Sequence, residues 1–169
     1  MVDPSRHAQK KNWLESIAQS IPGFSGYLDR EDRRESDALT RKWLENRLQQ
    51  SKRGLDERLR SLVDAGQLDA LPAWERVRSR LDGFMNKIRS AERGYSGFFD
   101  FVKVTEDELD QVYQLDSGLV ADVRAWAELV EQPGEATAQA AADLLRKLEV
   151  IEANFGKRGD ILRGIGPDA

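Results

Sequence analysis

The chain has 169 residues, of which 40% are hydrophobic and 33% charged, and its 26 basic and 30 acidic side chains give a net charge of −4. This length and apolar content fit a single domain with a packed core and exclude a disordered chain. The chain has no cysteine, which excludes disulfides, thiolate metal sites and cysteine nucleophiles. Its one histidine is His7, so one chain cannot form a metal centre with several histidine ligands.

The first two predicted helices are separated by a glycine-rich turn. In residues 7–21, apolar side chains recur at helical spacing opposite charged ones, which predicts a short amphipathic helix. A long helix is predicted over residues 29–65, with the Asp29 carboxylate at its N-cap. Gly54 lies inside this helix, where glycine costs about 1 kcal/mol relative to alanine, so a kink there is an open question.

Three further helices follow at residues 72–93, 105–131 and 135–155, each with apolar residues at alternating steps of three and four. Thr105 and Glu108 have the spacing of a capping box, which predicts the start of the second of the three.

No segment shows the alternation of a strand, so the predicted fold class is all-α: a bundle of three to four long antiparallel helices with a short N-terminal amphipathic helix. We expect residues 1–6 to be flexible, residues 7–166 to form one helical-bundle domain and residues 167–169 to form a tail. Glycines after residue 155 predict the end of the last helix, followed by a short docking turn around Ile161, Leu162 and Ile165.

Charge is distributed unevenly along the chain. Residues 1–93 carry 19 basic and 15 acidic side chains, a net of +4, whereas residues 94–169 carry 7 and 15, a net of −8. The two halves therefore attract each other, either within one chain or between chains in head-to-tail association.

Asp116 and Glu152 each interrupt the apolar stripe of a predicted helix. Helical bundles build di-metal sites from such carboxylates, but those sites also use a Glu-x-x-His motif, which this chain lacks. Glu149 and Glu152 form only a Glu-x-x-Glu pair of the kind found on solvated helices. The alternative is that these acids lie at the edge of their stripes or pair with an arginine. We expect no catalytic residues, no metal site and no cofactor.

Two short segments, residues 23–29 and 94–100, combine glycines with aromatic residues. Their aromatic side chains either fold back as buried plugs over the end of the bundle or form an exposed patch for a partner. The first segment leads into a dense charge block at residues 30–37, in which Arg33 and Asp37 are one helical turn apart and can pair. The candidate partner-binding residues are Phe24, Tyr27, Arg30, Arg33, Arg34, Asp37, Tyr95, Phe98 and Phe99.

Nucleic-acid binding is not favoured, because acidic residues interleave with the arginines of the first half and the whole chain is acidic. No run of about 18 apolar residues and no secretory signal pattern is present, so we expect no membrane span and a cytoplasmic location.

The two glycine-aromatic motifs resemble those of a family of uncharacterised bacterial all-helical proteins. The first motif is Ile-Pro-Gly-Phe-Ser-Gly-Tyr at residues 21–27, followed by Glu-Asp-Arg-Arg and by Asp37; the second is Tyr-Ser-Gly-Phe-Phe-Asp at residues 95–100, followed by Tyr113 and Asp116. The resemblance covers about residues 21–130. It implies a helical fold and, for partners, membrane-linked scaffold proteins of the band-seven type, and it implies no activity or cofactor.

The sequence thus predicts a non-enzymatic interaction or scaffold protein that binds a protein partner or itself through the glycine-aromatic turns and the charge block. The alternative is peripheral binding to a membrane surface, with a membrane-linked scaffold as partner. That binding would use the helix around Trp13 and Ile17 or the aromatic residues Phe98, Phe99 and Phe101.

Overall fold

The structure is a computed structural model that describes residues 4–28, 30–95 and 105–164. In these ranges the chain forms five helices and no strand, which confirms the all-α fold class. The helices are α1 (Pro4–Ser20), α2 (Arg30–Asp64), α3 (Leu71–Tyr95), α4 (Glu106–Glu131) and α5 (Ala138–Arg163).

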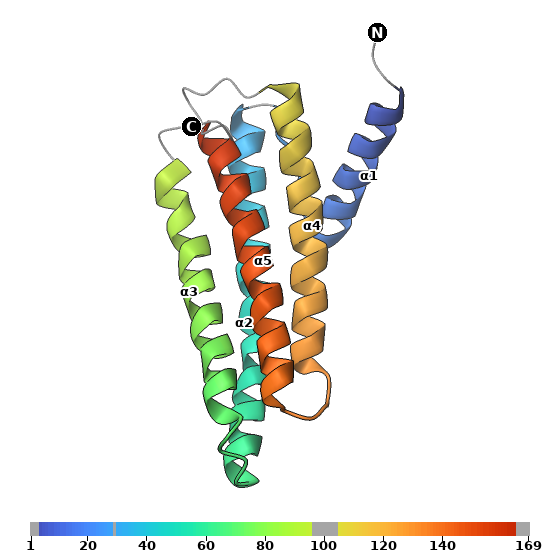
Figure 1. Cartoon of the computed structure of the whole chain (residues 1–169). Helices are drawn as coiled ribbons and strands as arrows, with labels where there is room; N and C mark the ends of the chain where they lie inside the picture. The colour runs from blue at the N-terminus through green and yellow to red at the C-terminus, as the bar shows by residue number, and fades with distance from the viewer. Residues whose placement is uncertain (1–3, 29, 96–104, 165–169) are drawn as a thin grey trace.

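The four longer helices pack in a ring in the order α2, α3, α5, α4 (Figure 1). The sequential pairs α2–α3 and α4–α5 are antiparallel, whereas the neighbours α2–α4 and α3–α5 run parallel. The predicted bundle of antiparallel helices is therefore matched only in part, because α3 and α4, which follow each other in the sequence, lie on opposite corners of the ring. Among the described helices, α1 packs against α4 alone and leans away from the bundle toward its N-terminal end (Figure 1).

The helix α1 begins earlier than predicted. Pro4 is its first residue, a position where proline loses no hydrogen bond, so the expected flexible segment 1–6 is wrong for residues 4–6. Arg6 extends from this first turn to the carboxylates of Asp107 and Asp110 on α4. These pairs join the basic first half of the chain to its acidic second half.

Other ion pairs join the two halves within the bundle. Arg47 of α2 forms a bidentate pair with Glu131 of α4, with one N···O distance of 2.6 Å. Arg80 and Lys87 of α3 both reach Glu152 of α5. Part of the charge separation is therefore neutralised within one chain.

Helix α2 is continuous through Gly54. A Cβ atom at this position would lie 3.2 Å from the carbonyl oxygen of Val130, so the glycine lets α2 approach the end of α4 closely. The predicted capping box at the start of α4 is confirmed, with the Thr105 side chain accepting from the Glu108 amide and the Glu108 side chain accepting from the Thr105 amide. The predicted N-cap Asp29 lies outside the described residues.

Helix α5 is longer than predicted, continuing through Gly156 and Gly159 to Arg163. The glycines disfavour helix by about 1 kcal/mol each, but Phe155, Arg158 and Leu162 are buried on one face, and tertiary packing of that face outweighs the local preference. The helix ends at Gly164 in the left-handed conformation, with φ of 74°. Ile161 and Leu162, which were expected in a separate docking turn, are therefore part of α5, and Ile165 lies outside the described residues.

The core has two connected regions. The larger one lies among α2, α3, α4 and α5, where the buried indole N–H groups of Trp74 and Trp126 donate to the carbonyl oxygens of Thr137 and Leu144 at 3.1 and 2.9 Å. The smaller one joins α1 and the following turn to α4 and α5. None of the described helices has a stretch long and apolar enough to cross a lipid bilayer.

Candidate functional site

The turn between α1 and α2, residues 21–28, folds into the bundle and buries its aromatic side chains. Phe24 is nearly buried and Tyr27 completely so, and their rings meet edge to face at 5.5 Å. Gly26 has φ of +101°, and a Cβ atom there would lie 2.9 Å from the Tyr113 hydroxyl oxygen, so only glycine fits. For this turn, the structure agrees with the plug interpretation.

Hydrogen bonds to side chains fix the backbone of the turn. The Gly26 amide donates to the Ser36 hydroxyl at 3.2 Å, and that hydroxyl donates back to the Gly26 carbonyl at 2.8 Å. The Tyr27 amide donates to the Tyr113 hydroxyl at 2.7 Å, and Arg33 Nε donates to the Tyr27 carbonyl at 2.8 Å. These contacts satisfy the polar groups that burial takes from water.

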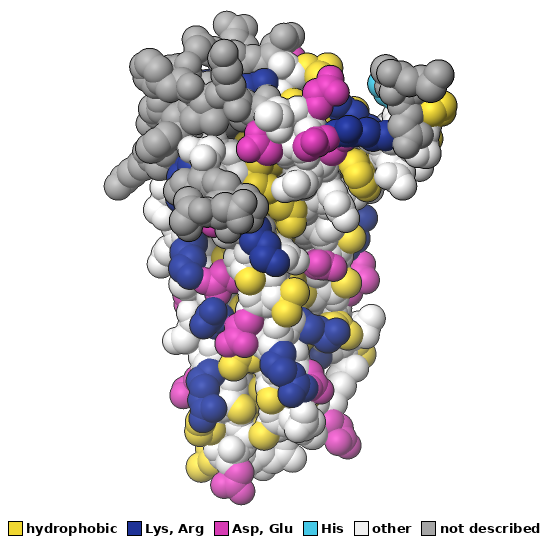
Figure 2. All heavy atoms as spheres, turned by 45° about the horizontal axis from the view of Figure 1, so that its top comes forward, with side chains coloured by type: hydrophobic (Ala, Val, Ile, Leu, Met, Phe, Trp, Pro, Cys, Tyr) yellow, Lys and Arg dark blue, Asp and Glu magenta, His cyan; other side chains and the backbone are white. Residues whose placement is uncertain are grey.

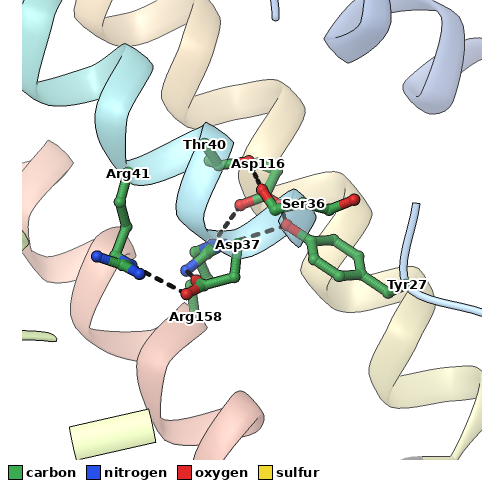
Figure 3. Close-up of polar contacts among 7 residues, drawn as sticks. All are labelled: Tyr27, Ser36, Asp37, Thr40, Arg41, Asp116 and Arg158. Atoms are coloured by element: carbon green, nitrogen blue, oxygen red, sulfur yellow. Dashed lines mark hydrogen bonds and ion pairs between the residues drawn. The ribbon is translucent and has the colours of Figure 1, made fainter. Parts of the chain in front are cut away.

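Below the turn lies a buried ionic network formed by Tyr27, Asp37, Arg41, Asp116 and Arg158 (Figure 3). The Arg158 guanidinium donates from Nε to Asp116, from Nη1 to Asp37 Oδ1 at 2.7 Å and from Nη2 to the Tyr27 hydroxyl at 3.1 Å. The Tyr27 hydroxyl donates to the other Asp116 oxygen, and Arg41 Nε donates to Asp37 Oδ2 at 2.9 Å. The network thus links the turn to α2, α4 and α5.

The network is electrically balanced, since two carboxylates face two guanidinium groups. Burial raises the pKa of Tyr27 well above its ordinary value, and the Asp116 charge raises it further, so the phenol stays protonated and acts as a donor. Burial also raises the pKa of Asp116, while the charge of Arg158 opposes that rise. Tyr27, Asp116 and Arg158 have no exposed surface, so a substrate does not reach them in this conformation.

Glu152, the second predicted candidate acid, lies apart from this network. It accepts from Arg80 Nε at 2.6 Å and from Lys87 Nζ. Burial alone would raise the pKa of Glu152, but these two cations outweigh burial and lower it. Both candidate acids therefore pair with arginine, and no group of three or more acidic or histidine side chains in the described ranges has the placement of a metal site.

Several predicted partner-binding residues are not on the surface. Phe24, Tyr27 and Asp37 are buried, so their prediction as contact residues does not fit the structure. The predicted pairing of Arg33 with Asp37 is also wrong, because Asp37 points into the core toward Arg158 and Arg41 while Arg33 reaches back to the turn.

Arg34 is exposed, as expected for a surface residue. The side chains of Arg30 and Tyr95, and all of Phe98 and Phe99, lie outside what the structure describes. Their predicted role in binding stays a prediction.

Sequence reasoning missed Arg158, which is the centre of the network. The spacing of the apolar residues could have predicted that Arg158 is buried. The buried stripe of α5 continues in steps of three and four through Leu148, Ile151, Phe155, Arg158 and Leu162. The prediction that the helix ends at residue 155 removed Arg158 from that stripe.

Comparisons with protein-family models, with curated proteins and with solved structures found no match for this chain.

Proposed function

We propose that this chain is a non-enzymatic helical interaction protein of the cytoplasm that binds a protein partner at the end of the bundle where α2 begins. The observation that carries the proposal is the buried ionic network. Its polar groups satisfy one another within the protein, so they serve to hold the turn and α2 in one arrangement rather than to act on a substrate.

The fixed turn presents Leu28 to solvent directly after the buried Tyr27. The Leu28 side chain is 66% exposed, and Arg34 is exposed on the first turns of α2. An apolar side chain held by a fixed turn is a suitable anchor for a protein contact, because little conformational entropy is lost on binding.

Affinity capture from a native lysate with the full chain as bait tests this proposal. Leu28→Glu and Arg34→Glu should each remove the same captured protein, and that protein, once purified, should bind the wild type directly and the variants at least tenfold more weakly. Arg33 is unsuitable for this test because it supports the turn. Val63→Glu is the matched control, since Val63 is 54% exposed at the far end of α2. If both surface variants retain every partner of the wild type, the start of α2 is not the binding surface.

Peripheral membrane binding through α1 is the second candidate, favoured by the packing of this helix on α4 alone. Ile17 is fully buried against the bundle, so membrane insertion requires α1 to detach. Co-sedimentation with anionic vesicles at low salt is the direct test. Wild-type protein should bind, Ile17→Glu should not, and wild-type protein that remains in the supernatant would end this candidate.

A further inference from the structure

The outer face of α4 and α5 exposes apolar side chains around a groove. Leu129 of α4 is 42% exposed and Val150 of α5 is 58% exposed. Both line a groove of about 210 Å³ between the helices, together with the apolar Ala125 and Ile151 and the charged Asp122 and Lys147. Figure 2 shows apolar side chains interspersed with both signs of charge on the face where α5 lies.

The solvent side of α5 carries a regular stripe opposite its buried face. Asp143, Arg146, Val150, Ala153 and Lys157 follow one another at steps of three, four, three and four, so they project from one side of the helix. Asp143 is partly exposed and the other four are exposed. The stripe has Asp143 at its N-terminal end, where Arg146 pairs with it, Val150 and Ala153 at its centre and Lys157 at its C-terminal end.

The two end charges of the stripe are complementary to each other. Asp143 and Lys157 are each seven residues from Val150, so two copies of α5 that pair antiparallel about Val150 bring Asp143 of each copy opposite Lys157 of the other. A parallel pair would instead place like charges opposite each other, which is unfavourable. One twofold axis thus pairs both ends of the stripe, as in isologous dimers.

We propose that α5 pairs antiparallel with α5 of a second copy of this chain through this stripe, whose central residue Val150 also lines the groove between α4 and α5. The inference goes beyond the proposed function, because it concerns self-association and uses a face of the molecule other than the start of α2.

Charge exchange tests the register. In sedimentation equilibrium, the wild type should dimerise, and Asp143→Lys and Lys157→Asp should each raise the dimer dissociation constant at least tenfold. The variant with both changes should recover the wild-type value, because the opposite charges are restored across the axis. Asp143→Lys also loses the in-chain hydrogen bonds from Gln139 and Arg146, so circular dichroism checks its helicity. If Asp143→Lys unfolds, Lys157→Asp alone tests the pairing.

Cross-linking provides a second measurement, because the chain has no cysteine of its own. Val150→Cys should form a covalent dimer under mild oxidation, whereas Val63→Cys, which is similarly exposed, should remain a monomer. A wild type that stays monomeric at 100-fold the concentration used for partner binding, or a doubly exchanged variant that fails to dimerise, would overturn the inference. Partner binding by a monomeric Lys157→Asp variant would leave the proposed function intact.

Discussion

Replacement of Arg158 by methionine should strongly destabilise the fold. The guanidinium donates to Asp116, Asp37 and Tyr27, all buried, and its loss leaves two carboxylates in the core with Arg41 as the remaining cation of the network. Removal of one partner from a buried ion pair typically costs about 3–5 kcal/mol. This is a large part of the about 5–15 kcal/mol that stabilises an ordinary domain.

Urea denaturation followed by circular dichroism measures this loss. Arg146→Met on the same helix is the control and should change the free energy of unfolding by less than about 0.5 kcal/mol, because Arg146 is exposed. Combining Arg158→Met with Asp116→Asn should recover part of the loss, because Asp37 then keeps Arg41 as its partner and no carboxylate of the network is left uncompensated. If Arg158→Met costs no more than Arg146→Met, the network does not stabilise the fold as argued.

The same variant should respond to pH in a definite direction. Burial raises the pKa of Asp116, and Arg158 opposes that rise, so removing Arg158 should raise the pKa further. A carboxyl group whose pKa is higher in the folded than in the unfolded protein favours the folded state as pH falls. Arg158→Met should therefore lose less stability relative to the wild type at pH 5 than at pH 8, and an equal loss at both would contradict this explanation.

Three further changes are tested by the same denaturation measurement. Gly26→Ala should lower the free energy of unfolding by about 2–3 kcal/mol, because φ is +101° and the new Cβ meets a hydroxyl oxygen at 2.9 Å. Gly83→Ala should raise it by about 0.5–1 kcal/mol, because that Cβ would point into open space inside α3. Glu152→Gln should be less stable than the wild type above about pH 5, and the difference should shrink as pH falls through the lowered pKa of Glu152, since Lys87 and Arg80 stabilise its ionised form. The reason given for Gly26 is refuted if Gly26→Ala is more stable than the wild type, and the reason for Gly83 if Gly83→Ala is less stable. The reason for Glu152 is refuted if the difference between Glu152→Gln and the wild type does not depend on pH.

The sequence predicted the helices well because their signals are local. The apolar spacing of α3 and the capping box of α4 depend on residues within a few positions of one another, and both helices lie close to the predicted bounds. The end of α5 was missed because Gly156 and Gly159 are local stop signals that packing overrides. The reason for Gly54 was also hidden, since it depends on a carbonyl group 76 residues away along the chain.

The site was predictable only as a set of unusual residues. Tyr27, Asp37 and Asp116 were each singled out, and pairing of Asp116 with an arginine was among the alternatives. Their meeting could not be read from spacing, because they converge on Arg158 from three separate elements. Local spacing instead favoured an Arg33 pair for Asp37, which the depth of Asp37 in the core rules out.

The placement of Arg158 also bears on why a bundle would retain a buried ionic network. Replacing such a network by apolar residues of similar volume is often neutral or stabilising, so stability alone does not explain it. In the ring of helices, α2 and α5 lie on opposite corners. Arg158 of α5 pairs with Asp37 of α2 across the ring and with Asp116 of the neighbouring helix α4. An apolar side chain would tolerate several rotations and axial shifts of α5, whereas a guanidinium with two fixed carboxylate partners accepts one. We infer that the network specifies the register of α5 against α2 and α4, and thereby the position of the turn that ends at Leu28.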